Sequence, residues 1–357
     1  MRIFLVGGGT GGPSAPLIAV GEALAAFSPK AEFFFIGNKP SFDRNFLAGT
    51  ALKMQYLRIP AGKWRRYFSL LNMVDIFKLI FGFFKSLYLI GRYKPDIIFG
   101  AGSFVQVPVA VHQQDAEPLL STRLTAPIAR LVTVALSGSA KDLPDSSGLF
   151  ARAPKSKLHV TGNPVRSAML RGSAMRARQY FHLSSDYPIV LVLGGGTGSA
   201  ALNAVLRQAL PELCKYVQVI HVTGGRGNII MARERYHPYN FLGAELADAY
   251  AACDLVIARA GMSTVSELSA LGKAAILVPL PDSPQEDNVR LLVFYKCAIG
   301  VFQEFFNADL LVRLTRKILW SRELQITLRD NIKRLMPKDA DKHIAKLLIK
   351  LHADPGK

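Results

Sequence analysis

The chain has 357 residues and a formal net charge of +18. Apolar residues make up 50% of it, which excludes an intrinsically disordered protein, and a chain of this length is expected to form two domains. The excess of positive charge predicts an anionic partner, which could be nucleic acid, a membrane surface or a phosphorylated substrate.

The first elements expected are a buried strand over residues 2–6, a glycine loop and a helix over about residues 17–27. Strand, glycine loop and helix together are typical of a mononucleotide-binding unit. The loop matches GxGxxG, but the second strand, residues 32–36, ends in Gly-Asn-Lys without the acidic residue that binds the ribose of NAD. An NAD cofactor is therefore not expected. We also expect no secretory signal peptide, because the strand follows Met-Arg at once.

The most apolar stretch, residues 67–91, predicts a long helix. Three charges argue against a membrane span, and the polar residues share one narrow face: Asn72, Asp75, Lys78, Gly82, Lys85 and Ser86. The preceding segment mixes basic and aromatic residues, among them Trp64, Arg65 and Arg66, which suits an anionic lipid surface. Two interpretations stay open: a helix at a membrane interface, or a mostly buried helix after a solvated basic loop.

Two further strands are expected over residues 97–99 and 107–111. The first leads into a third glycine loop, Gly100-Ala101-Gly102-Ser103, and the second ends in His112-Gln113-Gln114-Asp115. Ligands of such sheets bind at the carboxyl ends of the strands. After a strand over residues 158–160, the Asn-Pro step at 163–164 marks a chain reversal and a domain boundary. Arg166 follows, either as a contact to a diphosphate or as an ordinary surface arginine.

The second half repeats the pattern of the first. A strand over residues 189–193 leads into Gly-Gly-Gly-Thr-Gly at 194–198, the same string that stands at 7–11, and a helix over about residues 201–210 follows. Two glycine loops in matching strand–loop–helix contexts predict two tandem doubly wound α/β domains. Further on, residues 308–351 are basic and helical, and the last helix could cross back onto the first domain. Three widely spaced cysteines suggest neither a disulfide framework nor a metal site.

Residues 257–268 carry the clearest functional signal. They follow a buried strand, turn at Gly261 and open a helix whose first turn, capped by Ser263 or Thr264, can bind phosphate. Glu267 lies one turn further in, where a carboxylate could accept hydrogen bonds from two ribose hydroxyls. Phosphate and ribose together indicate a nucleotide; the alternative is an ordinary capped helix start. A strand over residues 275–279 then leads to Gln285 and Asn288, one helical turn apart.

Over nearly its whole length, the chain resembles the MurG family of N-acetylglucosaminyl transferases. The resemblance rests on the order and spacing of these segments: Gly8-Gly9-Thr10-Gly11-Gly12, Gly162-Asn163-Pro164-Val165-Arg166, the glycines at 194–196, residues 259–267, and Gln285 with Asn288. It implies a GT-B fold, in which two Rossmann-like domains face each other across a cleft. The implied bounds are residues 1–162, with a C-terminal helix at 338–351, for the acceptor domain, and residues 163–337 for the donor domain.

The resemblance also implies the site residues. The donor-binding residues would be Arg166, Gly196, Thr197, Gly243, Met262, Ser263, Thr264, Glu267 and Gln285. Glu267 would hold the ribose, Gly243 would meet the uracil through its backbone, and Arg166 would touch the phosphates. The glycine-loop residues on the acceptor side would be Thr10, Gly11, Gly12, Gly102 and Ser103. No metal or other cofactor is expected.

The departures from the family concentrate on the acceptor side. Pro13 stands where the family has a loop histidine, and the family's His-Glu-Gln-Asn is His112-Gln113-Gln114-Asp115 here. Gly196 replaces a serine of the family. About 11 residues are missing after Pro108, where the family has a crossover helix between parallel strands. His112 and Asp115 remain as candidates for the general base.

Two functions are therefore expected as alternatives. One is an inverting transferase that moves N-acetylglucosamine from UDP-GlcNAc to a lipid-linked MurNAc-pentapeptide, peripheral on the cytoplasmic face of the plasma membrane. The other is a UDP-sugar-binding homologue whose transferase activity is lost or altered. Nucleic-acid binding would use the positive charge, but no recognised nucleic-acid motif is present.

Overall fold

The computed structural model describes residues 1–7, 11–38, 50, 52–60, 71–101, 110–118, 122, 125–126, 129–136, 157–196, 198–225 and 234–354. The chain divides into two compact units, Met1–Pro164 with Pro337–Lys357, and Val165–Met336. We call them unit 1 and unit 2. The division follows Pro164 and Met336, within two residues of the boundaries expected from the sequence.

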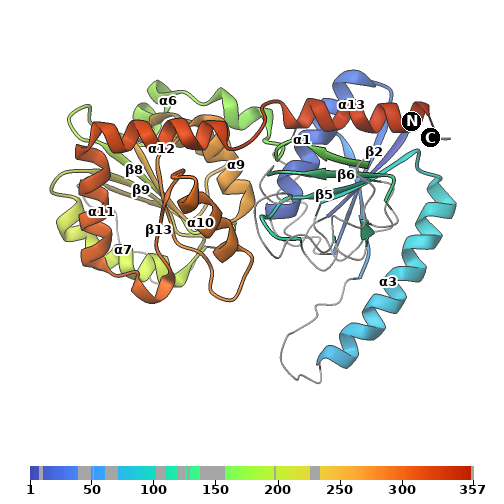
Figure 1. Ribbon diagram of the computed structural model, residues 1–357, viewed down its shortest axis with the longest axis horizontal. Coiled ribbons are helices and arrows are strands. Elements are labelled where there is room, and N and C mark those ends of the chain that lie inside the picture. Colours follow the sequence, from blue (N-terminus) through green and yellow to red (C-terminus); the bar gives the residue numbers. More distant parts are fainter. Residues whose placement is uncertain are drawn as a thin grey trace. The chain divides into compact units, whose positions relative to one another are not determined.

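Unit 1 contains a seven-stranded sheet in the order β3-β2-β1-β4-β5-β6-β7 (Figure 1). Every neighbouring pair is parallel. The described strands are β1 (Arg2–Val6), β2 (Glu32–Gly37), β3 (Met54–Arg58), β4 (Ile97–Ala101), β5 (Ala110–Gln113), β6 (Leu131–Val134) and β7 (Leu158–Val160). The long helices are α1 (Gly11–Phe27), α3 (Leu71–Tyr93) and α13 (Ala340–Ala353). Strand order reverses between β1 and β4, the topology of a doubly wound sheet.

Side chains of β1 alternate between two cores, because successive residues of a strand point to opposite faces. Ile3 and Leu5 belong to the core that includes Ile344 and Leu348 of α13, and α13 packs beside α1. Phe4 and Val6 belong to the core on the α3 side. The last helix of the chain thus completes the core of the unit in which the chain begins.

Helix α3 turns its apolar side outward. Its buried positions include Gly82 and Leu89, while Ser86 is half-buried. A Cβ at position 82 would lie 2.4 Å from the carbonyl oxygen of Pro60, so glycine allows the helix to approach the segment after β3 closely. Large apolar side chains between 46% and 63% exposed line the opposite side: Ile80, Phe81, Phe83, Phe84, Leu87 and Tyr88. The interpretation of α3 as a mostly buried helix is therefore wrong.

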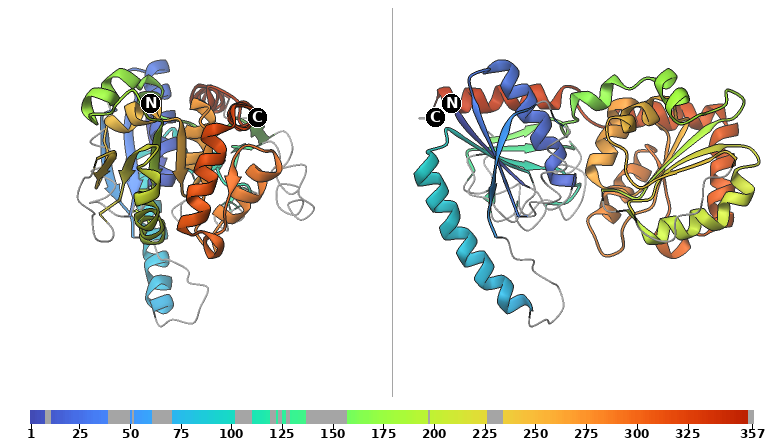
Figure 2. Two further views of the ribbon diagram at one scale, coloured as in Figure 1. Left: turned by 90° about the vertical axis from the view of Figure 1, so that its left-hand side faces the viewer. Right: turned by 180° about the vertical axis from the view of Figure 1, so that it is seen from behind.

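Figures 1 and 2 show how α3 lies in unit 1. Its carboxyl-terminal end lies beside the sheet, and its amino-terminal end stands away from it. No helix in the described ranges is long and apolar enough to cross a membrane. The basic segment that precedes α3, residues 61–70, lies outside the described residues.

Two boundaries in unit 1 differ from those expected. Helix α1 begins at Gly11 rather than near residue 17, and it includes Pro13 and Pro16. Pro13 lies in the first turn, where N–H groups have no intrahelical acceptor, whereas Pro16 lies in the second turn and removes one intrahelical hydrogen bond. Strand β5 extends to Gln113, so His112 lies within the strand and not beyond its end.

Unit 2 contains a six-stranded sheet in the order β10-β9-β8-β11-β12-β13. All neighbouring pairs are again parallel. The strands are β8 (Ile189–Leu193), β9 (Gln218–Val222), β10 (Tyr236–Tyr239), β11 (Leu255–Ala258), β12 (Ala275–Leu277) and β13 (Ile299–Gly300). The helices are η3 (Ser167–Arg171), α6 (Ala174–Tyr180), α7 (Ala200–Leu213), α8 (Glu245–Ala252), α9 (Met262–Leu271), α10 (Gln285–Phe294), η4 (Gln303–Phe305), α11 (Ala308–Trp320) and α12 (Arg322–Arg334). Both predicted doubly wound sheets are confirmed.

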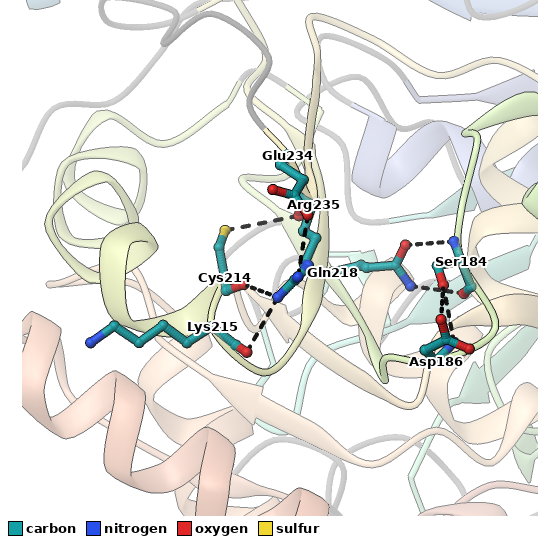
Figure 3. Close-up of polar contacts among 7 residues, drawn as sticks. All are labelled: Ser184, Asp186, Cys214, Lys215, Gln218, Glu234 and Arg235. Atoms are coloured by element: carbon teal, nitrogen blue, oxygen red, sulfur yellow. Dashed lines mark hydrogen bonds and ion pairs between the residues drawn. The ribbon is translucent and has the colours of Figure 1, made fainter.

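Polar side chains hold the amino-terminal edge of the unit 2 sheet (Figure 3). Gln218 at the start of β9 accepts a hydrogen bond from the Ser184 N–H at 2.7 Å and donates to the Ser184 carbonyl at 3.0 Å. The guanidinium of Arg235, before β10, donates to the carbonyl oxygen of Cys214 at 3.0 Å. These contacts fix where the strands begin, so that their carboxyl ends meet at the opposite edge.

Candidate active site

The candidate site of unit 2 lies at the carboxyl ends of β8 and β11, where the strand order reverses. The glycine loop after β8 is packed tightly. A Cβ at Gly198, whose φ is +70°, would lie 2.4 Å from the Thr223 carbonyl oxygen, and a Cβ at Gly194 would lie 2.5 Å from the Ser199 nitrogen. Glycine is therefore required at both positions. Gly196 is exposed on the same loop, and Thr197 lies outside the described residues.

The loop after β11 leads into α9. Its N-cap is Gly261, and no side chain caps the helix. The prediction that Ser263 or Thr264 caps α9 is wrong, because the helix begins at Met262 and both residues already lie in its first turn. N–H groups in a first helical turn have no intrahelical acceptor and carry the positive end of the helix dipole. Ser263 and Thr264 are half-buried in this turn.

Glu267, in the second turn of α9, is one of three groups that the structure brings together. Its Oε2 accepts a hydrogen bond from the Tyr250 hydroxyl at 2.9 Å. Burial raises the pKa of Glu267, while the nearby charge of Arg166 and the hydrogen bond from Tyr250 lower it. Burial also raises the pKa of Tyr250 well above its usual value. A partly buried carboxylate thus lies close to one arginine and one fully buried phenol.

Helix α8, which carries Tyr250, is fixed at both ends. Asp248 accepts hydrogen bonds from the guanidinium of Arg176 at 2.7 and 3.0 Å and from the Ser173 N–H at 2.7 Å. The ammonium of Lys273 donates to the carbonyl oxygens of Ala251 and Cys253 at the end of the helix. Cations favour this end because of the helix dipole. These contacts hold the helix that carries Tyr250.

The remaining donor-side candidates also lie in unit 2. The side chain of Gln285 lies beside the α9 loop, since its Nε2 would be 4.0 Å from a Cβ at Gly261, and its Oε1 accepts from the Leu280 N–H. Asn288 is fully buried and donates to the Ala260 carbonyl oxygen at 3.2 Å. The N–H of Gly243 donates to Oε2 of Glu245 at 3.0 Å. A uracil at Gly243 would therefore exchange places with the Glu245 carboxylate.

Arg259 connects several loops beneath the candidate site, a role that could not be assigned from the sequence. The residue is 7% exposed, and the four groups to which it donates hydrogen bonds are neutral. It donates to the Ser199 hydroxyl, the Val278 and Pro279 carbonyl oxygens and the Gln303 amide oxygen. One guanidinium thus joins the loop after β8, the segment after β12 and η4. Tyr250 was also missed, since a tyrosine in an apolar helix resembles any core aromatic until its hydroxyl has a partner.

In unit 1, the two candidate bases differ sharply in environment. His112 is fully buried; its Nδ1 lies 2.8 Å from the Thr133 hydroxyl, and its Nε2 lies 2.8 Å from Oδ1 of Asn163. Because the amide oxygen only accepts, Nε2 carries the proton and Nδ1 accepts from Thr133. Burial lowers the pKa of His112 to about 4. Asp115 follows β5 and is half-buried.

The other acceptor-side candidates are only partly described. Gly11 and Gly12 form the first residues of α1, while Thr10, Gly102 and Ser103 lie outside the described residues, as does the shortened connection after β4. Gln113, which stands where the family has glutamate, is buried and donates to the carbonyl oxygens of Asp115 and Glu117. Among the described residues, no group of three or more His, Cys, Asp or Glu side chains could hold a metal ion.

Comparisons with known proteins agree with this geometry. Residues 3–121 match the glycosyltransferase family 28 N-terminal domain, and residues 189–344 match the family 28 C-terminal domain. A UDP-N-acetylglucosamine--N-acetylmuramyl-(pentapeptide) pyrophosphoryl-undecaprenol N-acetylglucosamine transferase of Treponema denticola is 33% identical over 88% of each chain. The protein of the same name from Borreliella burgdorferi is 30% identical over 98% of this chain and 96% of its own. The chain belongs to the MurG family.

The structure of Acinetobacter baumannii MurG resembles this MurG family member in fold, with a TM-score of 0.68 and 21% identity over 98% of this chain and 99% of that one. The two-domain GT-B fold expected from the resemblance is thereby confirmed. Like its relatives, this MurG homologue is a glycosyltransferase of the hexosyl-transferring class. Which of its residues contact the donor and the acceptor stays a prediction.

Proposed function

We propose that the protein transfers N-acetylglucosamine from UDP-GlcNAc to the lipid-linked MurNAc-pentapeptide, converting lipid I to lipid II. The acceptor hydroxyl attacks the anomeric carbon, the bond from that carbon to the β-phosphate oxygen breaks, and UDP leaves with inversion. The observation that carries the donor half is the grouping of Glu267, Tyr250 and Arg166 beside the amino end of α9. The identity of both substrates is inferred from the names of the relatives.

Donor binding would place the ribose on Glu267 and the diphosphate at the first turn of α9. A carboxylate accepts hydrogen bonds only, so it matches two vicinal hydroxyls as donors. Arg166 and the helix dipole would stabilise the charge that develops on the leaving UDP. Gln285, beside Gly261, would reach the sugar. The backbone of Gly243 would bind the uracil after its N–H has given up the hydrogen bond to the Glu245 carboxylate.

On the acceptor side, we propose Asp115 rather than His112 as the general base. A base needs an available lone pair within reach of the proton that it removes. The free lone pair of the His112 ring is engaged by Thr133, and the ring has no exposed surface. Asp115 is half-buried at the carboxyl end of β5, the edge at which parallel sheets bind ligands.

We also propose a peripheral location on the cytoplasmic face of the membrane, and the outer side of α3 supports the contact with a membrane surface. Six large apolar side chains are exposed there, from Ile80 to Tyr88. Lys78, Lys85 and Arg92 follow each other at seven-residue spacing, so they lie along one side of the helix. Aromatic residues that enter the headgroup region and basic residues that pair with anionic lipid are typical of an interfacial helix. The enzyme would thus reach an acceptor whose lipid stays in the bilayer.

The alternative function is a UDP-sugar-binding homologue without transferase activity. It is favoured by one observation, the burial of Gln113, whose amide supports the backbone of the loop that follows instead of supplying the family's glutamate.

Turnover of UDP-GlcNAc with a lipid I analogue separates the two functions. Formation of lipid II supports the transferase. UDP binding without formation of lipid II would support the UDP-sugar-binding homologue. Absence of UDP binding would exclude both functions.

A further inference from the structure

The hydroxyl of Tyr250 is the polar atom at the centre of the donor-side grouping. The residue is 0% exposed and sits on α8, and its hydroxyl donates to Oε2 of Glu267 on α9 at 2.9 Å. A buried phenol without a partner costs about 1–3 kcal/mol, so packing alone would favour phenylalanine here. The hydroxyl therefore serves Glu267 specifically.

The hydrogen bond restricts how the Glu267 carboxylate can turn. The terminal torsion of a free glutamate is broad, so its two oxygens would sample many orientations. With Oε2 held by Tyr250, the plane of the carboxylate is fixed. An ionised carboxylate has about four lone-pair sites, of which Tyr250 uses one. Enough remain for the two hydroxyls of a vicinal diol.

One hydrogen-bond donor and one charge near Glu267 both lower the pKa of its carboxyl group. Tyr250 from α8 and Arg166 from the segment before η3 both favour the ionised carboxylate, against the effect of burial. A protonated Glu267 would carry an O–H of its own and would be a poorer acceptor for two hydroxyl donors. Tyr250 thus supports both the orientation and the charge that a diol requires.

We propose that Tyr250 is a positioning residue that orients Glu267 to accept both ribose hydroxyls and so makes the donor site selective for ribonucleotides over 2′-deoxyribonucleotides. This proposal rests on the proposed function, in which Glu267 holds the ribose. Tyr250 touches no ligand itself and acts through the carboxylate.

Calorimetric titration of Tyr250→Phe with UDP and with 2′-deoxy-UDP tests the proposal. We expect UDP to bind about 5–30-fold more weakly, because the Glu267 carboxylate is no longer held in one orientation, and 2′-deoxy-UDP to change less than about twofold. Lowering the pH should weaken UDP binding at a higher pH than in the wild type, because the pKa of Glu267 rises without its donor. Equal weakening of both nucleotides would show a merely structural role and overturn the proposal.

Two further variants make the outcome specific. Tyr236→Phe removes a similarly buried hydroxyl, which lies 2.9 Å from Nδ1 of His221 in the same unit, and should leave both affinities unchanged. Replacing Tyr250 by 4-aminophenylalanine keeps an N–H donor at the same place and should restore the preference for UDP. It also tests the proposal if the phenylalanine variant does not fold. Failure of this rescue in a folded protein would overturn the proposal.

The variant Glu267→Ala distinguishes failure of this proposal from failure of the proposed function on which it rests. If the variant binds UDP and 2′-deoxy-UDP in the wild-type ratio, Glu267 does not hold the ribose and the donor assignment falls. If Glu267→Ala abolishes the preference while Tyr250→Phe retains it, only the role of Tyr250 is overturned.

Discussion

The guanidinium of Arg259 donates from Nε to the hydroxyl of Ser199 at 3.1 Å and thereby joins the end of β11 to the N-cap of α7. Its other nitrogens bind carbonyl oxygens after β12 and the Gln303 amide. Because these partners are neutral and three of the four contacts are buried, loss of the guanidinium would leave several acceptors without a donor. A single residue therefore links three segments at this edge of the sheet.

Arg259→Met should lower the free energy of unfolding of the protein by about 2–4 kcal/mol, because stranded buried acceptors carry a desolvation cost. Urea unfolding followed by circular dichroism measures the change. Arg313→Met, an exposed arginine on α11, is the matched control and should change stability by less than about 0.5 kcal/mol. An Arg259 variant as stable as this control would contradict the structural role.

Glu267→Ala should weaken UDP-GlcNAc binding by about 1.5–3 kcal/mol, the value of hydrogen bonds to a charged group. Glu323→Ala, on the exposed side of α12, serves as the control in the same titration. Since burial raises the pKa of Glu267, binding that needs its ionised form should fall as the pH drops through that raised value. An affinity unchanged by the Glu267 substitution would remove this residue from the ribose site.

Asp115→Asn should lower kcat by about 10²–10⁴-fold and leave donor affinity nearly unchanged, as expected when a general base is lost. The substitution restores the family's own residue and preserves shape, so the protein should fold. Single-turnover kinetics with a lipid I analogue measure the effect. Turnover at the wild-type rate would exclude Asp115 as the base and return attention to His112.

Replacing Phe81 and Phe84 of α3 by serine should weaken binding to anionic vesicles by about tenfold or more, because two large side chains would no longer enter the interface. The unchanged protein should bind anionic vesicles more strongly than neutral vesicles, and its binding to anionic vesicles should weaken as the salt concentration rises. Phe305→Ser, an equally exposed phenylalanine in unit 2, is the control in vesicle sedimentation. Equal binding to both vesicle types would leave α3 without a lipid-facing role.

Acidification should destabilise the protein between about pH 6.5 and pH 4. Burial lowers the pKa of His112 and of His221 to about 4 in the folded state, against about 6.5 when unfolded. The unfolded chain therefore binds protons first as the pH falls, so the stability present above pH 6.5 is lost toward pH 4. His112→Gln should flatten the pH dependence of the unfolding midpoint of unit 1. The substitution His343→Gln, at an exposed histidine, should leave this pH dependence unchanged. An equal pH dependence in both variants would contradict the contribution of His112.

Several features of the molecule could be predicted from the sequence. Apolar runs followed by glycine loops predicted β1, β4 and β8, because only buried parallel strands are apolar on both faces. The strands β3, β6, β10 and β13 were not predicted. The glycine at 198 reflects a loop that leaves no room for a side chain. The position of Glu267 in the second turn of a helix could be predicted as well, because its distance from a helix start is a local property of the chain.

The tertiary structure decided which side of α3 faces outward. Periodicity defines the sides of a helix, but the contact of Gly82 with Pro60, between segments distant in sequence, selects the side that packs. It also decided the environment of His112, since β5 continues two residues further than the pattern indicates and carries the ring into the core.

The sequence by itself determined that this protein has two doubly wound domains and that Glu267 lies one turn into a helix that follows a buried strand, because strand burial, glycine turns and helix starts are local consequences of neighbouring residues. Only the tertiary structure decided which groups serve that carboxylate. Tyr250 and Arg166 lie 17 and 101 residues from Glu267, and no local pattern specifies a contact that forms only when α8 and the segment before η3 pack beside α9.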